Sequence, residues 1–450
     1  MAGANKKYDK IIVGLGNTGI SCARFFSGIS ESVAIVDNRD NPPCLEMARN
    51  QFPALEIYLG PFSPDLLCTA DELIVSPGVS IAEPAILAAV NKGISVVGDI
   101  EIFCRQTSAP VIAITGSNGK STVASLVNSM LVNAGRDTRL GGNFGTPALD
   151  LLKDKEPDVY VLELSSFQLE TTNSLNPLAS VILNITEDHM DRYTAMDSYV
   201  SAKKKIYTGS GVIVLNMDDV IASDVVTENR DVIRYSTRQP GENALGITVK
   251  EGREYIASGD RVIIPVNEIM LKGRHNLSNA MAALALGSVA GLSWEEMADT
   301  LRKFEGLPHR CQTVDSINGI DWINDSKATN VGACLAAIEG LGGKENLILI
   351  AGGLGKGADF SRLADTARGH VRAAILIGKD AGLVSKALQN VTDIFYAIDM
   401  EAAVKLAADI SSKGDIVLLS PACASFDMFK DYQDRGTRFI NAVQGLRQGT

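Results

Sequence analysis

Residues 111–122 read V-I-A-I-T-G-S-N-G-K-S-T, and this stretch decides how the chain is organised. A β-branched apolar run ends in a glycine-rich turn, and residues 123–131 then carry apolar side chains at helical spacing. Gly116 and Gly119 allow backbone N–H groups to point into the turn, and the helix N-terminus adds positive potential. The stretch therefore predicts a strand–loop–helix unit that binds phosphate.

The same turn carries groups that suit a nucleotide and its metal. Lys120 supplies a cation for phosphate oxygens, and the hydroxyl of Ser121 can ligate Mg²⁺. The spacing G-x-x-G-K-S is shorter than that of the common phosphate loop, because Ile114 stands where that loop has its first glycine. We expect ATP and Mg²⁺ as ligands, and the alternative is a turn that holds Gly and Lys for structural reasons.

Composition narrows the class of protein. The 450-residue chain is long enough for two to four domains, and its 46% hydrophobic and 21% charged content is ordinary for a soluble protein. A formal net charge of −11 argues against a general basic surface for nucleic acid. The seven cysteines form no C-x-x-C pair, the polar start shows no signal peptide, and no apolar run reaches about 18 residues. We expect a cytoplasmic protein with reduced thiols, no membrane span and no nucleic-acid partner, monomeric by default.

A second glycine-rich turn lies near the start of the chain. The apolar residues 10–13 are followed by G-L-G-N-T-G at 14–19, and the predicted strand 33–36 ends at Asp37. This strand–turn–helix pattern, with an acid about 20 residues after the glycines, is the fingerprint of a dinucleotide-binding fold. NAD or FAD, another diphosphate ligand and a purely structural turn all remain compatible with the pattern.

Ser76, Pro77 and Gly78 follow another predicted strand, 73–75. Ligands of open α/β sheets bind at such strand ends, although a plain strand-ending turn fits the spacing equally well. Residues 104–110 have the composition of a linker. We therefore expect a first domain at 1–108, Rossmann-like and holding a substrate that carries phosphate.

The next part of the chain places acids at predicted strand ends. Glu163 lies near the end of the apolar run 159–164, and His189 follows the run 180–184. Acids at strand ends that face a phosphate loop are natural Mg²⁺ ligands, and a lone acid in an apolar strand is costly to bury without a partner. A solvated strand-end acid and a surface acidic turn are the alternatives. The acids next to His189 are Glu187, Asp188 and Asp191.

Three consecutive lysines, 203–205, lie in a predicted helix that starts near Ser198. Such a run is usually a solvated helix face, and the pattern alone selects none of the three. From 230 to 268, short strands and turns predict hairpins at one edge of a sheet.

An Ala-rich helix is predicted over 280–290. Asn276 and Asn279 lie at or just before its start, where they would act as caps or contact a base or ribose. A boundary follows at 305–310. The second domain is accordingly expected at 109–307.

The last part alternates strands and helices and predicts a third, doubly wound α/β domain at 308–450. Its strand ends carry Asp325 to Lys327, a glycine-rich turn with Lys356, and the segment 420–427. Lys356 is followed by no Ser or Thr, so it is expected to meet a carboxylate rather than to form a second ATP loop. The fold class is thus α/β with three domains: a Rossmann-like N-terminal domain, a central P-loop ATPase-like domain and a C-terminal Rossmann-like domain.

Seven segments in this order resemble motifs of the Mur ligase family, and the resemblance covers essentially the whole chain. They are T-G-S-N-G-K-S-T (115–122), E-L-S-S-F-Q-L-E (163–170), N-I-T-E-D-H-M-D-R-Y (184–193), G-R-H-N-L-S-N-A (273–280), G-L-P-H-R (306–310), N-D-S-K-A-T-N (324–330) and S-P-A-C-A-S-F-D (420–427).

Within that family, the first domain with G-L-G-N-T-G is similar to the alanine- and glutamate-adding members, and no D-N-P-R motif of the diaminopimelate-adding member is present. S-A-K-K-K-I-Y (201–207) favours members with a carbamylated lysine. The resemblance thus implies the glutamate-adding member. Its reaction is the ATP-dependent joining of D-glutamate to UDP-N-acetylmuramoyl-L-alanine through an acyl phosphate, in peptidoglycan precursor synthesis.

The resemblance also implies a role for each matching residue. Lys120, His189 and Lys203 would be catalytic, with Ser121 and Glu163 on one Mg²⁺ and His189 and Lys203, as a carbamate, on a second. The nucleotide positions would be Gly116, Ser117, Asn118, Gly119, Lys120, Ser121, Thr122, Asn276, Asn279, Arg310 and Asp325. The UDP-substrate positions would be Asn17, Thr18, Asp37, Arg39, Ser76, Gly78 and Asn143. The D-glutamate positions would be Lys327, Thr329, Lys356, Ser425, Phe426 and Tyr432.

The chain departs from the family pattern at three of these positions, namely Asn17, Phe426 and Tyr432. Other readings make different predictions. A related Mur or folylpolyglutamate-type ligase would use another amino acid, and an NAD-dependent oxidoreductase would need no ATP. A non-catalytic nucleotide-binding module would bind ATP without phosphate release, and it would give the lysines of the third domain no function.

Overall fold

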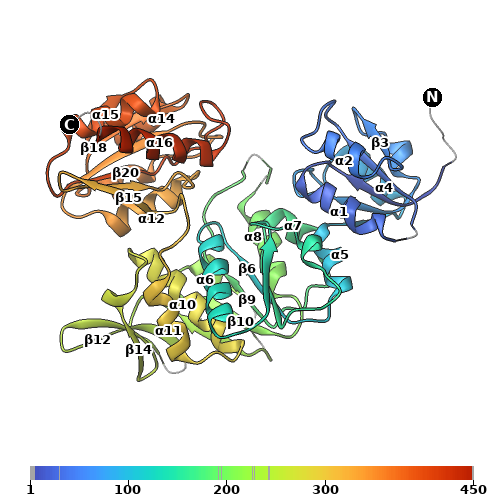
Figure 1. The fold of residues 1–450 in the computed structure, drawn as a ribbon, viewed down its shortest axis with the longest axis horizontal. Helices are drawn as coiled ribbons and strands as arrows, with labels where there is room; N and C mark the ends of the chain where they lie inside the picture. Colours follow the sequence, from blue (N-terminus) through green and yellow to red (C-terminus); the bar gives the residue numbers. More distant parts are fainter. Residues whose placement is uncertain are drawn as a thin grey trace.

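The computed structural model describes residues 6–29, 31–190, 192–193, 195–225, 227, 229–241 and 244–447. Within them the strands form three separate sheets, and Figure 1 shows three lobes, with the N-terminal and C-terminal lobes standing on either side of the central one. The predicted α/β class with three units is confirmed. The boundaries at 108 and 308 stay predictions, and Asp191 lies outside the described residues.

The N-terminal lobe has a parallel sheet in the order β3-β2-β1-β4-β5. The order reverses at β1, so the predicted glycine turn that follows β1 lies at the switch point of the sheet. Gly19 is required there, because an added Cβ would lie 2.0 Å from the carbonyl oxygen of Gly14. The elements are β1 (Tyr8–Val13), α1 (Asn17–Ser27), β2 (Val33–Asp37), α2 (Leu45–Gln51), β3 (Glu56–Leu59), α3 (Pro64–Leu67), β4 (Ala70–Val75), α4 (Pro84–Asn91), β5 (Ser95–Val97) and α5 (Asp99–Gln106).

The central lobe has a sheet in the order β14-β13-β12-β11-β10-β9-β6-β8-β7. Neighbours from β7 to β12 pair in parallel, and β12, β13 and β14 pair antiparallel, which confirms the predicted edge hairpins. The strands are β6 (Val111–Thr115), β7 (Thr138–Gly142), β8 (Val159–Glu163), β9 (Ala179–Ile182), β10 (Val212–Asn216), β11 (Val232–Tyr235), β12 (Ala244–Lys250), β13 (Arg253–Ser258) and β14 (Arg261–Pro265). The helices are α6 (Lys120–Asn133), α7 (Ser166–Glu170), α8 (Met196–Lys204), α9 (Val220–Ser223), α10 (Arg274–Val289) and α11 (Trp294–Lys303).

The C-terminal lobe has a sheet in the order β15-β16-β20-β17-β18-β19, parallel except for the antiparallel pair β15 and β16. The predicted doubly wound domain is confirmed in outline, with an antiparallel edge added. The elements are β15 (Gln312–Ile317), β16 (Ile320–Asn324), α12 (Val331–Leu341), β17 (Leu347–Gly352), α13 (Arg362–Ala367), β18 (Val371–Ile377), α14 (Ala381–Leu388), β19 (Asp393–Tyr396), α15 (Met400–Ile410), β20 (Ile416–Leu419) and α16 (Tyr432–Leu446).

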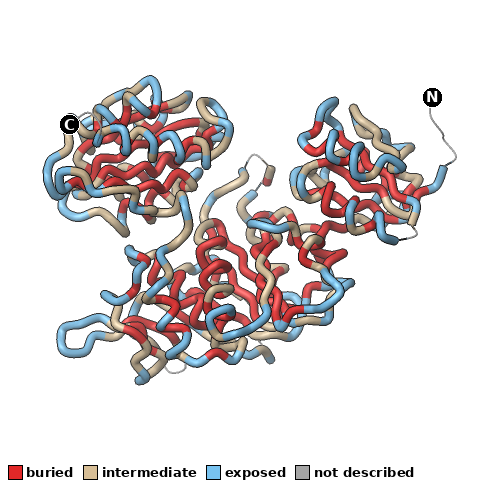
Figure 2. The backbone as a smooth tube through the Cα atoms, viewed as in Figure 1, coloured by how far each residue is buried: buried red, intermediate tan, exposed pale blue. Residues whose placement is uncertain are grey.

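Each lobe has its own buried strands, drawn in red at the centre of each lobe in Figure 2. Strand β6 is buried along its whole length, and α10 packs beside α6 with small Ala side chains that allow close approach. The predicted start of this Ala-rich helix at 280 was wrong, because α10 begins at Arg274. In the described part of the chain, no helix combines the length and the apolarity needed to cross a bilayer.

Candidate functional site

The predicted phosphate loop joins β6 to α6 and is already folded back on itself. The ammonium of Lys120 donates to the carbonyl oxygens of Gly116 and Ser117, both at 2.9 Å. Gly119 has φ +84°, and a Cβ on it would lie 2.6 Å from Oδ1 of Asn279. Only glycine fits this backbone, since both the left-handed conformation and the space exclude a side chain.

Glu163 ends β8 directly opposite the loop. Its Oε2 accepts a 2.5 Å hydrogen bond from Oγ of Ser121, and its Oε1 accepts a 2.8 Å bond from the amide of Asn143. Arg310, from the junction with the C-terminal lobe, donates to Oγ of Ser121 at 2.7 Å. The hydroxyl and the carboxylate that were predicted as Mg²⁺ ligands therefore lie together.

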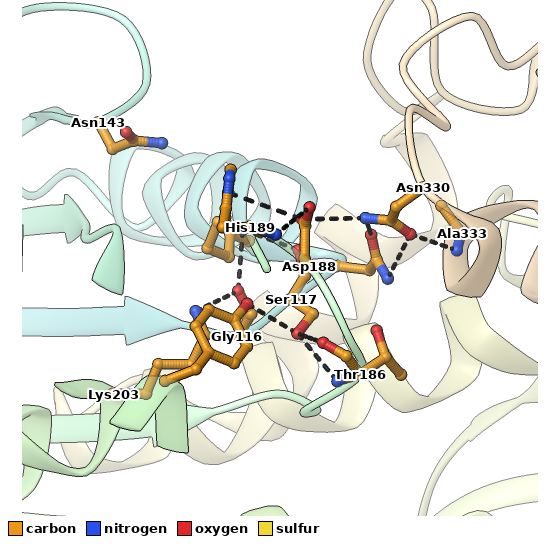
Figure 3. Close-up of polar contacts among 12 residues, drawn as sticks. Gly116, Ser117, Asn143, Thr186, Asp188, His189, Lys203, Asn330 and Ala333 are labelled. Carbon is orange, nitrogen blue, oxygen red and sulfur yellow. Dashed lines mark hydrogen bonds and ion pairs between the residues drawn. The ribbon is translucent and has the colours of Figure 1, made fainter. Parts of the chain in front are cut away.

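Lys203, at the end of α8, is 2% exposed, and its Nζ donates to the carbonyl oxygen of Gly116 at 2.9 Å (Figure 3). Burial, together with the nearby charge of Lys120, lowers the pKa of Lys203 well below that of an ordinary lysine. Its neighbours Lys204 and Lys205 instead bond Asp224 and a backbone carbonyl. The structure thus separates the one deeply buried lysine from the other two.

His189 lies across the loop from Lys203 and has a positive φ of 59°. Its ring packs against Phe167, with 4.8 Å between the ring centroids, and its Nε2 lies 3.7 Å from Oδ2 of Asp188 (Figure 3). Burial lowers the pKa of His189 although Asp188 opposes the shift. A neutral imidazole with a free lone pair is the form that binds metals. In the described part of the chain, no three His, Cys, Asp or Glu side chains gather as a ready metal cluster.

A cavity of about 360 Å³ unites the loop with the C-terminal lobe. It is lined by residues from the central sheet ends, from the junction and from three loops of the C-terminal sheet, which follow β16, β17 and β20. Of the predicted site residues, its lining includes Ser117, Asn118, Gly119, Lys120, Ser121, Asn143, Glu163, His189, Lys203, Arg310, Lys327, Thr329 and Lys356.

A second cavity, of about 430 Å³, lies at the switch point of the N-terminal sheet, and all seven predicted UDP-substrate residues line it. Asp37 shapes this cavity rather than offering a free acceptor. Its carboxylate binds the backbone N–H of Leu15 at 2.7 Å and the guanidinium of Arg39 at 2.7 and 2.9 Å. Burial alone would raise the pKa of Asp37, but these hydrogen bonds hold it below the ordinary value. Asn143 lines both cavities and connects them.

Several predicted nucleotide residues lie beneath the site rather than in the cavity lining. Asn276 and Asn279 are inside α10, nearly buried, and bond each other at 3.1 Å. Asp325 is buried and accepts from Oγ of Ser420 at 2.8 Å and from the N–H of Cys311 at 3.1 Å. Burial raises the pKa of Asp325 to about 6. Gly116 and Thr122 flank the loop and are likewise outside the lining.

Some of the predicted D-glutamate residues line the first cavity and others lie outside its lining. Lys327, Thr329 and Lys356 line the cavity, whereas Ser425 is buried and Phe426 is 67% exposed. The Nζ of Lys327 lies 3.8 Å from the ring centroid of Tyr432. Burial, with a contribution from the nearby charge of Arg310, lowers the pKa of Lys327 to about 8.

Sequence reasoning missed Arg192. Its guanidinium lies 4.1 Å from the ring centroid of Phe167, bonds Glu170 at 2.9 Å and donates to the carbonyl of Pro77 at 2.5 Å. It thereby ties the rim of the N-terminal lobe to the ring that packs on His189. The segment 184–193, which resembles a family motif, includes Arg192 and was the available signal. Its contacts could not be predicted, because Pro77 lies 115 positions away along the chain.

Sequence reasoning also missed Asn330. It connects the C-terminal lobe to Asn118 of the phosphate loop and to Asp188. The sequence offers its place at the end of the segment 324–330, which resembles a family motif, and before an apolar helical run, where Asn is a common cap.

Models of one protein family match the chain in three consecutive segments. A Mur ligase MurD-like N-terminal domain matches residues 8–98, the Mur ligase middle domain matches 114–287, and the Mur ligase glutamate ligase domain matches 309–423. Together these segments span the three sheets described above.

Curated relatives match over nearly the full length. The UDP-N-acetylmuramoylalanine–D-glutamate ligase of Nitrosococcus oceani is 48% identical over 436 residues, which is 97% of this chain and 96% of that one. The ligase of the same name from Pseudomonas savastanoi pv. phaseolicola is 48% identical over 439 residues, which is 97% of this chain and 98% of that one. The crystal structure of MurF ligase from Thermotoga maritima in complex with ADP has a TM-score of 0.61 at 16% identity, covering 100% of this chain and 97% of that chain, so the fold is shared.

Proposed function

This chain belongs to the Mur ligase family, and we propose that it joins D-glutamate to UDP-N-acetylmuramoyl-L-alanine with conversion of ATP to ADP and phosphate. The observation that carries this function is the 48% identity, over 97% of the chain, to ligases of that name. The cavities support it, because one at the N-terminal lobe meets one at the phosphate loop through Asn143. The reaction belongs to the cytoplasmic stage of peptidoglycan precursor synthesis, carried out by a monomer with domains at 1–108, 109–307 and 308–450.

The second cavity holds the UDP part of the substrate. The backbone of the glycine turn and the guanidinium of Arg39 meet the diphosphate, and the polar side chains of Asn17 and Thr18 meet the nucleoside or sugar. The muramoyl-alanine arm then extends past Asn143, which places the alanine carboxylate at the mouth of the first cavity.

ATP occupies the phosphate loop. Lys120 leaves the carbonyls that it bonds in the free protein and meets the β- and γ-phosphates, while loop N–H groups bind the same oxygens. Arg310 adds a second cation beside Ser121. Asn276, Asn279 and Asp325 act from beneath, where they hold the loop and the junction in place for the nucleotide.

The donor set around Ser121 fits Mg²⁺. A hydroxyl and a carboxylate already lie 2.5 Å apart beside the loop, and Mg²⁺ prefers such oxygen ligands and completes its shell with phosphate oxygens and waters. Ser121 and Glu163 would hold one ion, and His189 with Lys203 would hold a second. Bound there, Mg²⁺ would neutralise phosphate charge as it is transferred.

Lys203 serves a metal only after it changes charge. Its lowered pKa leaves a share of the amine unprotonated, and the nitrogen lone pair attacks the carbon of CO₂ to give a carbamate and one released proton. The ammonium is a cation with no lone pair, whereas the carbamate is an anion with two oxygen atoms that can ligate a metal. The deep burial of this one lysine supports the assignment.

The chemistry then needs two steps. The alanine carboxylate attacks the γ-phosphorus and releases ADP, which gives an acyl phosphate. The amine of D-glutamate attacks the acyl carbon, and the tetrahedral intermediate expels phosphate while the amine loses its proton. Lys327, Thr329 and Lys356 line the cavity and orient the carboxylates of D-glutamate, and the ring of Tyr432 packs against the Nζ of Lys327. Ser425 and Phe426 lie outside this lining, and their contacts with D-glutamate stay predictions.

Phosphate release from ATP tests the function, with UDP-N-acetylmuramoyl-L-alanine and, in separate reactions, D-glutamate, L-glutamate, L-alanine and meso-diaminopimelate. We expect release that depends on both the UDP substrate and D-glutamate. Release with L-glutamate but not with D-glutamate would refute the stereochemical assignment. A change in nicotinamide absorbance without any need for ATP would instead support the oxidoreductase reading.

A further inference from the structure

Asn330 is a residue of the C-terminal lobe whose side chain bonds both the phosphate loop and Asp188. It caps helix α12, and its Oδ1 accepts from the N–H of Ala333 at 2.9 Å. Its Nδ2 donates to Oδ1 of Asn118 at 3.2 Å. The same nitrogen donates to Oδ2 of Asp188 at 3.1 Å, as Figure 3 shows. Oδ1 of Asn330 also accepts a longer hydrogen bond, of 3.4 Å, from Nδ2 of Asn118, so the donors of this amide serve the central lobe and its acceptor serves mainly its own helix.

Both partners of this amide are part of the catalytic geometry. Asn118 lies in the loop, where its N–H is held by Asn184 at 2.8 Å. Asp188 accepts the N–H of His189 at 3.0 Å, and its other oxygen lies 3.7 Å from the ring of His189. The positions of the loop and of the His189 ring therefore both depend on the hydrogen bonds that Asn330 donates.

The approach between the lobes at this point is close. A Cβ added to Gly332 would lie 2.9 Å from Oγ1 of Thr186 and 3.4 Å from Nδ2 of Asn118. The first turn of α12 is therefore seated directly on the segment that leads to His189. Lys327 and Thr329, which line the cavity, precede Asn330 in the same short segment.

From this geometry we propose that Asn330 is a positioning residue that couples nucleotide binding to amino-acid binding. The inference rests on the proposed function, since it takes ATP and D-glutamate as the two ligands. ATP orders the loop that Asn118 belongs to, and D-glutamate orders the segment 327–330. Binding of either ligand therefore favours the hydrogen bond between Asn330 and Asn118. Because this bond also favours binding of the other ligand, each ligand raises the affinity for the other by the same factor.

Swapping the amide of Asn330 and the carboxylate of Asp188 distinguishes the coupling role of Asn330 from its role as a helix cap. In Asn330→Asp the side chain still caps α12, because Asp is as good a cap as Asn. It keeps the 3.4 Å bond accepted from Asn118 but loses both donated bonds, and it places a second negative charge beside Asp188. In the double variant with Asp188→Asn, a donor again faces an acceptor. Asp399→Asn is the matched control, because Asp399 caps α15 through the N–H of Ala402 at 2.7 Å and does not line either cavity.

The measurement is steady-state phosphate release by the full chain, with KM for D-glutamate determined at saturating and at limiting ATP. We expect Asn330→Asp to raise the KM values for ATP and D-glutamate by about tenfold or more, as for a lost hydrogen bond to a charged group, and to abolish their mutual dependence. The KM for UDP-N-acetylmuramoyl-L-alanine stays within twofold. In the Asp188→Asn background the same substitution costs about tenfold less, and Asp399→Asn behaves as the parent chain.

Two results overturn the inference while leaving the proposed function intact. One is an active Asn330→Asp variant whose KM values for ATP and D-glutamate still depend on each other as in the parent. The other is an equal loss in both backgrounds of the double-mutant cycle, which indicates a structural role alone. A parent chain that releases no phosphate with D-glutamate overturns the proposed function, and the inference with it.

Discussion

Lys327 offers a test in which one side chain should set the pH dependence of amino-acid binding. Its Nζ lies in the cavity above the ring of Tyr432, and burial lowers its pKa to about 8. A group with that pKa is about nine-tenths charged at pH 7 and about one-tenth charged at pH 9. Because only the ammonium attracts a carboxylate, the KM for D-glutamate should rise about tenfold between these pH values. A lysine with the ordinary pKa would stay charged over the same range, and KM would not change.

Lys327→Arg is the matched control, since a guanidinium keeps its charge throughout this range. The assay is phosphate release at saturating ATP and UDP substrate, with D-glutamate varied at half-unit steps from pH 7 to pH 9.5. The arginine variant should show a higher KM, because its fork is larger than the ammonium that it replaces, and the pH dependence of that KM should come from D-glutamate alone. Titration of the D-glutamate amine affects both proteins alike and cancels in their ratio. A parent KM that changes less than twofold, or an arginine variant with the same rise as the parent, would refute the assignment.

Three further predictions concern the helix that follows the phosphate loop and the proposed metal ligands. Lys203→Ala should be nearly inactive and partly rescued by acetate or another short carboxylate in the phosphate-release assay, and full activity without rescue would end the carbamate proposal. Gly135→Ala should lose about 1–2 kcal/mol in thermal or urea unfolding, because φ is +78° there. Gly119→Ala should lose more, because φ is +84° and its Cβ would also lie 2.6 Å from Oδ1 of Asn279. Only Gly119→Ala should also lose ATP binding in calorimetry, since its Cβ meets Asn279 whereas nothing lies within 4 Å at Gly135. Glu163→Gln should raise the Mg²⁺ concentration needed for half-maximal rate by tenfold or more, and an unchanged Mg²⁺ titration would remove Glu163 from the ligand set.

The sheets were predictable because their strands are buried parallel strands. Such strands read as continuous apolar runs, and β6, β17 and β20 were recognised on that basis. The start of α10 was not, because its first turn, Arg274 to Leu277, is largely polar and carries no apolar period. Tertiary packing against α6 extends the helix where the local sequence favours a loop.

The residues of the candidate site likewise fall into those that local spacing predicts and those whose contacts depend on the fold. Residues within one strand–loop–helix unit, such as Lys120 and Ser121, were predicted because their spacing alone brings them together. Lys203 could be separated from its two neighbours only through the family resemblance, since the burial of one lysine in a run depends on the fold. Arg192 and Asn330 act across lobes, and their partners are set by docking, which no local pattern encodes.

The electrostatics of the loop connect these observations. Lys120 and Lys203 both donate to the same buried carbonyl oxygen, that of Gly116. Two positive charges therefore repel each other beside one acceptor. The charge of Lys120 contributes to the low pKa of Lys203 and so favours the unprotonated amine, which is the form that would attack CO₂. Conversion to a carbamate would reverse the charge at Lys203, remove it from the carbonyl and leave Lys120 as the one cation of this pair facing the nucleotide. The burial that makes a second ammonium costly here is therefore the same property that would prepare Lys203 to become an anionic ligand beside ATP.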